Sequence, residues 1–124
     1  MSGDAPKKEA AETIVDRLKR VESVLPPEGQ AYHVLEAQND AGERAGLWMT
    51  GPKGGIPVFQ TRESATDALR FVPSPRALGY AESAVRWAVH SLSSDEFRNL
   101  FLNPGLTLFV VHSMNDAGIE AQPL

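Results

Sequence analysis

Residues 106–112 read LTLFVVH, the most apolar stretch of the chain. Successive side chains of a strand point to opposite faces, so a continuous apolar run is typical of a strand buried on both faces. We therefore expect a central strand here. The residues NPG at 103–105 form a turn before it, and residues 98–102 are interpreted as a neighbouring strand.

Three more strands are predicted in the first half of the chain, at residues 31–38, 44–50 and 56–60. The turn residues NDAG at 39–42 suit a hairpin between the first two strands. The GPKGG loop at 51–55 then leads into the third. Pro57 has no amide proton to donate, so this third strand is expected to lie at a sheet edge.

Three helices are predicted, at residues 10–25, 61–72 and from Tyr80 or Ala81 to 92. The first carries apolar residues at helical spacing and ends at a pair of prolines, which lack the amide donor that a helix needs. Thr61 is placed to cap the second helix. The third has a continuous stripe of alanine, valine and leucine. Asp95 and Glu96 follow it and are interpreted as charges that favour a helix start.

These elements predict an α+β fold, with a mainly antiparallel sheet of about five strands and three helices packed on it. A chain of 124 residues has enough apolar surface for one core. We expect a single domain over residues 10–114. Residues 1–9 are predicted to be flexible, and residues 115–124 to be a loose tail.

The charge balance argues against several partners. Sixteen acidic and twelve basic residues give a net charge of −4, with basic and acidic residues interleaved near the N-terminus. Binding to nucleic acid through phosphate neutralisation and electrostatic membrane anchoring are therefore not expected. No apolar run approaches the roughly 20 residues that span a bilayer, and no signal segment is visible, so we predict a cytoplasmic protein.

Few residues suggest chemistry. The absence of cysteine excludes disulfides, thiolate metal sites and cysteine nucleophiles. His33, His90 and His112 have no partner at ligand spacing, so we expect no metal or cofactor. The serines near His90 lack the Gly-x-Ser-x-Gly context of a nucleophile elbow. The lysine of the GPKGG loop precedes a strand, which favours a plain turn over a phosphate-binding loop.

The aromatic residues suggest contact surfaces. On the predicted third helix, Trp87 falls about 130° from the centre of the apolar stripe, close to Tyr80. Trp48 points to the sheet face opposite Leu47 and Met49. An exposed tryptophan would be a candidate anchor for a partner, whereas the alternative is that both tryptophans belong to the core. The candidate interaction residues are Trp87, Tyr80, Trp48 and Leu18.

From Gly46 to Gly105, 60 of the 124 residues, the chain resembles the N-terminal domain of the SseB-like bacterial proteins. The resemblance is carried by the segments GLWM at 46–49 and IPVFQT at 56–61, the helix with Ala65 and Ala68, a second helix, and LNPG at 102–105. It implies an α+β module that binds or regulates, without an assigned catalytic centre. No functional residue is transferred by it.

The leading interpretation is a non-enzymatic protein-interaction or regulatory module. Its partner would be another protein or a second copy of itself. A homodimer would use the N-terminal helix, the Pro57 edge or the helix face that carries Trp87. The alternative is a small enzyme whose site is assembled from His112, His33 and nearby acids.

Overall fold

The computed structural model describes residues 13–51, 55–103 and 105–124. In chain order its elements are α2 (Ile14–Val24), β1 (His33–Gln38), β2 (Arg44–Trp48), β3 (Gly55–Val58), α3 (Arg62–Ala68), β4 (Arg86–Ser91), α4 (Ser94–Leu102), β5 (Thr107–Asn115) and β6 (Gly118–Pro123). This confirms the α+β class. None of the described helices is long and apolar enough to cross a bilayer.

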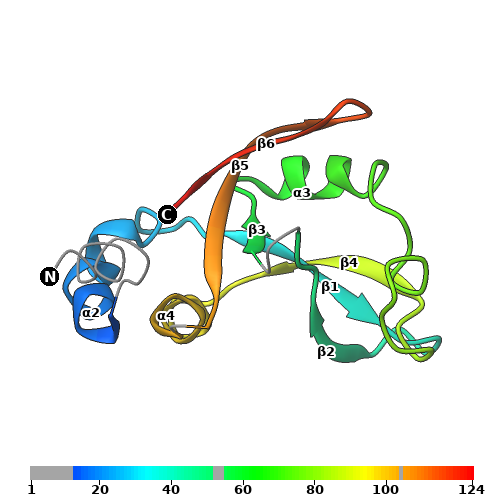
Figure 1. Ribbon diagram of the computed structural model, residues 1–124, viewed down its shortest axis with the longest axis horizontal. Helices are drawn as coiled ribbons and strands as arrows, with labels where there is room; N and C mark the ends of the chain where they lie inside the picture. Colours follow the sequence, from blue (N-terminus) through cyan, green and yellow to red (C-terminus); the bar gives the residue numbers. More distant parts are fainter. Residues whose placement is uncertain (1–12, 52–54, 104) are drawn as a thin grey trace, which may run out of the picture.

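The strands form two sheets of three, ordered β2-β1-β4 and β3-β5-β6, and not the single five-stranded sheet that we predicted. Three of the four strand pairings are antiparallel, while β3 and β5 run parallel. One bridge joins the sheets, because the backbones of His33 and Phe59 exchange hydrogen bonds of 2.9 and 2.8 Å. Figure 1 shows α2 beside α4 at one end of the molecule, near the C-terminus.

Local signals place the first elements as predicted. Thr13 caps α2, and Asp16 completes a capping box by accepting from the Thr13 backbone amide. The helix ends at Leu25, which adopts an extended conformation before Pro26. The hairpin β1–β2 forms around Gly42, whose φ of 82° suits glycine. Thr61 caps α3 by accepting from the Ser64 amide at 3.0 Å.

The predicted helix over residues 80–92 is wrong, because residues 86–91 form strand β4. Trp87 and Val89 lie on the face of β4 that packs with Leu35 and Ala37 of β1. Their spacing of two positions is the period of a strand. The same apolar residues fit a helical stripe, so periodicity alone does not separate the two structures.

The predicted strand over residues 98–102 is also wrong, because helix α4 covers residues 94–102. Ser93 and Glu96 form its capping box, so Asp95 and Glu96 do stand at a helix start as predicted. Phe97 and Phe101 are four positions apart and therefore share the buried face, where their rings stack at 6.0 Å.

The predicted loose tail is wrong over residues 118–123, which form β6 and pair antiparallel with β5. Beyond β6, the amide of Leu124 donates to the carbonyl of Leu108 at 3.0 Å. A one-residue irregularity near Ser113 interrupts the β5–β6 register. The second half of β5 and β6 together form a two-stranded ribbon that extends from the body (Figure 1).

Two hydrophobic clusters lie on opposite faces of β1. The cluster on the α4 side includes Val34 and Phe97, and the cluster on the α3 side includes Leu35 and Ala65. Adjacent residues of β1 thus serve different clusters, as the pleat of a strand requires. The apolar residues therefore form two hydrophobic clusters that share strand β1, and not the one core that we expected.

Candidate functional site

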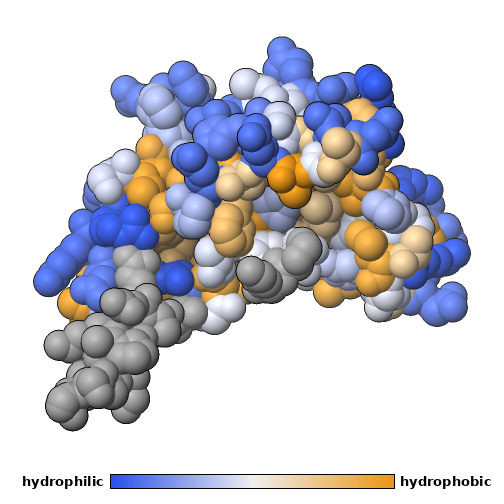
Figure 2. Space-filling model, turned by 45° about the horizontal axis from the view of Figure 1, so that its top comes forward, coloured by the Kyte–Doolittle hydropathy of each residue, from blue (hydrophilic) through white to orange (hydrophobic). Residues whose placement is uncertain are grey.

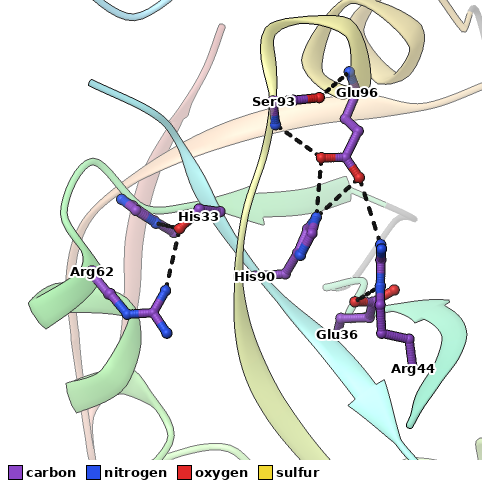
Figure 3. A network of polar contacts seen from close by, with 8 residues as sticks. His33, Glu36, Arg44, Arg62, His90, Ser93 and Glu96 are labelled. Carbon is purple, nitrogen blue, oxygen red and sulfur yellow. Dashed lines mark hydrogen bonds and ion pairs between the residues drawn. The ribbon is translucent and has the colours of Figure 1, made fainter. Parts of the chain in front are cut away.

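A buried carboxylate lies at the centre of the α4-side sheet face. Glu36, on β1, is 3% exposed. Its oxygen accepts from Arg44 Nε of β2 at 2.7 Å, and another Arg44 nitrogen lies 3.6 Å from Glu96. Because Arg44 reaches both acids, it links β1 to α4 through β2 (Figure 3).

Glu96 is the junction of the same network. The amide of Ser93 donates to its carboxylate at 2.9 Å, and His90 Nε2 lies 3.0 and 3.1 Å from the two carboxylate oxygens. The Ser93 amide is the main cause that lowers the pKa of Glu96 below its ordinary value, desolvation opposes it, and His90 lowers it further. The ring of Trp48 packs 5.7 Å from that of His90.

This network ties the sheet to the start of α4. It brings together two acids, an arginine and a histidine, the residue types of acid–base chemistry. Yet the acids already accept hydrogen bonds from the arginine, the histidine and a backbone amide. Such pairing stabilises the ionised form of Glu96 and occupies both carboxylates, which favours a structural role. Among the described residues, no three potential ligands converge in a metal-binding arrangement.

The lowered pKa of Glu96 predicts a loss of stability in acid. An acid whose pKa is lower in the folded chain contributes stability above its unfolded value, and this contribution is lost as the pH falls through the folded value. The free energy of unfolding should therefore fall as the pH drops below about 4.5, the ordinary value of Glu96. Urea denaturation between pH 7 and pH 3 measures this.

Glu96→Gln should flatten that pH dependence, since it removes the titrating group but keeps an oxygen acceptor. Asp95→Asn is the matched control, because Asp95 lies next to Glu96 and its side chain is 93% exposed. The interpretation fails if Glu96→Gln leaves the acid slope unchanged, or if Asp95→Asn changes it equally.

A second polar group lies on the opposite, α3-side face. Ser91 Oγ lies 2.8 Å from His33 Nδ1 and accepts from Arg62 at 3.2 Å. His112 instead lines a separate hollow of about 220 Å³ with Ser64 and Asp67 of α3. Among the described residues, no hydrogen bond joins His33 to His112, the pair on which the enzymatic alternative rests.

Trp87 does not lie on an exposed helix face, because β4 places it in the α3-side cluster with 8% of its surface exposed. Its indole nitrogen donates to the Pro73 carbonyl at 2.9 Å, and its ring meets Tyr80 edge-on at 5.1 Å. Tyr80 in turn donates to the carbonyl of Trp48 at 3.1 Å. These residues connect parts of the fold to one another.

Trp48 and Pro57 offer little free surface either. Trp48 is half-buried and packs on the α4-side cluster, on the face opposite Leu47 and Met49 as predicted. Pro57 lies on β3, which is an edge strand of its sheet as expected, but Pro57 itself is buried. Residues 52–54 of the GPKGG loop lie outside the described residues.

Helix α2 carries the most prominent aliphatic surface. Ile14, Val15 and Leu18 are 49, 54 and 55% exposed. The adjoining side of α2 faces the body, where Val21, three positions after Leu18, is buried in the α4-side cluster. Of the four candidate interaction residues, only Leu18 therefore lies on an exposed surface. We call Ile14, Val15 and Leu18 the α2 surface.

An apolar groove of about 330 Å³ lies over the β3-β5-β6 sheet and includes Met49, Phe109, Met114 and Ile119 in its lining. Gly55 belongs to its floor, and a Cβ there would collide with the Phe109 ring. Figure 2 shows hydrophobic side chains near the middle of the visible face and hydrophilic ones around its rim. Ile119, on β6, is 44% exposed.

The sequence interpretation missed the residues that the structure brings together. Glu36 lies between Val34 and Gln38 on one face of β1. Since Val34 points into the core, an acid two positions later on the same face should be buried too, and a buried acid needs a cationic partner. Ser91 and Arg62 carried no comparable signal, because strand register and helix placement bring them to His33.

Comparison with protein-family models, curated proteins and solved structures finds no match to this chain. The resemblance to SseB-like domains therefore stays a prediction.

Proposed function

We propose that this chain is a non-enzymatic interaction module that forms a weak homodimer through the α2 surface. The observation that carries the proposal is the exposure of Ile14, Val15 and Leu18 on one helix, each about half accessible. Neighbouring aliphatic side chains left in water favour association, because their contact removes apolar area from solvent. A binding role is also what the SseB-like resemblance implies.

The body of the protein holds α2 in place. One nitrogen of Arg17 donates to the carbonyls of Phe101, Asn103 and Leu106 at 2.8 to 2.9 Å. These carbonyls lie at and just beyond the C-terminal end of α4. A helix held in this way is ordered before it binds, so association costs less conformational entropy.

The charged residues around the α2 surface favour a second copy of the same surface as its binding partner. Lys19 and Glu22 lie beside Leu18 on the exposed side of α2, one cation and one anion. A two-fold arrangement in which Lys19 of one copy faces Glu22 of the other would pair opposite charges, and the surface carries no excess of one sign. Glu22 also pairs with Arg98 of its own chain at 3.2 Å, which further reduces repulsion.

The expected dimer is weak, because three side chains on a short helix bury less area than a standard stable interface of roughly 1,600 Å². Leu18→Glu should raise the dissociation constant at least about tenfold, since association would bury an unpaired carboxylate. Sedimentation velocity over a concentration series measures this constant. Thermal unfolding of the variant should stay close to that of the wild type, because Leu18 is 55% exposed in the single chain.

Leu78→Glu is the matched control, because Leu78 is a leucine that is 43% exposed outside α2. It should leave the dissociation constant unchanged. Ile119→Glu tests the apolar groove as the competing interface. A wild-type chain that stays monomeric at about 1 mM would refute the proposal, and so would a dimer that only Ile119→Glu disrupts.

A further inference from the structure

Three donor side chains from different elements converge on the α3 side of the sheet. Arg62 is the first residue of α3, His33 the first of β1 and Ser91 the last of β4. His33 and Ser91 are direct partners in the β1–β4 register. In Figure 3 the dashed line from Arg62 marks its hydrogen bond to Ser91 Oγ, which lies beside His33. We call Arg62, Ser91 and His33 the Arg62 cluster.

The hydrogen bonds of the cluster leave donors for a further group. Ser91 Oγ accepts from Arg62 at 3.2 Å and lies 2.8 Å from His33 Nδ1. When His33 is protonated it must donate at both ring nitrogens, so Ser91 then accepts twice and its own proton is directed elsewhere. The guanidinium of Arg62 has further N–H groups, and Arg62 and Ser91 are both exposed.

The positive charge of Arg62 is not neutralised by an ion pair. Among residues 13–51, 55–103 and 105–124, no carboxylate lies within 4.0 Å of its guanidinium, whereas Arg70 on the same side of the chain pairs with Asp67 at 3.1 Å. Glu63 is near enough to act on His33 through its charge. The cluster therefore combines a cation and a titratable imidazole that both contact one exposed hydroxyl, Ser91 Oγ.

We propose that the Arg62 cluster binds a phosphate dianion, either free or as the head of a small phosphomonoester. The planar fork of arginine matches two phosphate oxygens, and a hydroxyl and an imidazolium add donors from the β-sheet. The site is independent of the α2 surface, which lies at α4. It is therefore a second binding activity of the chain.

The charge state of His33 couples to this binding. Burial lowers the pKa of His33 below its ordinary value, Arg62 lowers it further, and Glu63 opposes both. A bound dianion favours the protonated ring, so phosphate should raise the pKa of His33. In the absence of phosphate, Arg62→Gln should also raise this pKa, because it removes a nearby cation.

The test is an NMR titration of the His33 ring protons with inorganic phosphate and, separately, with phosphoserine. At least one of the two should shift the ring signals to saturation, and Arg62→Gln should weaken binding at least about tenfold. Arg70→Gln is the matched control, since it removes the same charge from the neighbouring surface. It should leave the affinity unchanged. Ser91→Ala should weaken binding with Arg62 still in place.

The two probes separate the sources of the phosphate. Tighter binding of phosphoserine supports a monoester, and binding of inorganic phosphate alone supports the free ion. The proposal is overturned if His33 does not respond to either probe, if acetate binds as tightly as phosphate, or if Arg70→Gln weakens binding as much as Arg62→Gln. Dispersed amide spectra of each variant show that it is folded, so a negative result is informative.

Discussion

Arg44→Met should lower the free energy of unfolding by about 3 kcal/mol, because it leaves the buried carboxylate of Glu36 without its cation. Glu36 is 3% exposed and accepts from Arg44 at 2.7 Å. Breaking a buried ion pair costs about 3 to 5 kcal/mol. The Arg44 side chain is 54% exposed, so water reduces the effect toward the lower limit. Urea denaturation at pH 7 measures the change.

A double substitution separates the lost charge from lost packing. Glu36→Met combined with Arg44→Met removes both charges and leaves no buried polar group without a partner, so it should recover most of the stability. Arg86→Met is the control, because Arg86 is an exposed arginine that donates to the Asn39 carbonyl at 3.0 Å and forms no ion pair with Glu36. The account of Glu36 would be wrong if the double variant were no more stable than Arg44→Met.

Arg17→Met should destabilise the fold by about 2 to 4 kcal/mol and loosen α2 first. The guanidinium donates to three carbonyls, at Phe101, Asn103 and Leu106, and lies 5.9 Å from the Phe101 ring. Hydrogen bonds to a charged group contribute about 1.5 to 3 kcal/mol each, and three that share one donor group are not additive. Methionine keeps the aliphatic length but provides no donor.

Hydrogen exchange distinguishes local from global loosening in Arg17→Met. The amides of α2 should lose protection before those of β1, since α2 contacts the body mainly through α4. Lys19→Met is the control, because Lys19 is an exposed cation on the same helix. Equal loss of protection in α2 and β1 would show that Arg17 does not act as a local anchor.

Sequence reasoning succeeded where local chemistry decides the structure. Caps, prolines and glycine turns act within a few residues, so Thr61, Pro26 and the turn at Gly42 mark α3, the end of α2 and the β1–β2 hairpin. It failed over residues 80–102. Over residues 86–91 the apolar spacing fits both a helix and a strand, and pairing with β1 decides for β4. Over residues 94–102 the capping box of Ser93 and Glu96 starts helix α4.

The candidate sites were less predictable than the elements. Leu18 was expected on an amphipathic helix, and its exposure follows from the part of α2 that packs on α4. Trp87 was placed on the wrong element, so its burial could not be foreseen. The Arg62 cluster depends on the β1–β4 register, which sets His33 opposite Ser91. No sequence spacing encodes that contact.

The central claim is that two copies of the chain meet through α2. An isotope-filtered NOE experiment on a mixture of labelled and unlabelled chains detects this contact directly. We expect intermolecular NOEs between the methyl groups of Ile14, Val15 and Leu18, and their loss in Leu18→Glu. Intermolecular NOEs that arise only from Ile119 and its neighbours, or none at a concentration where sedimentation shows a dimer, would contradict the claim.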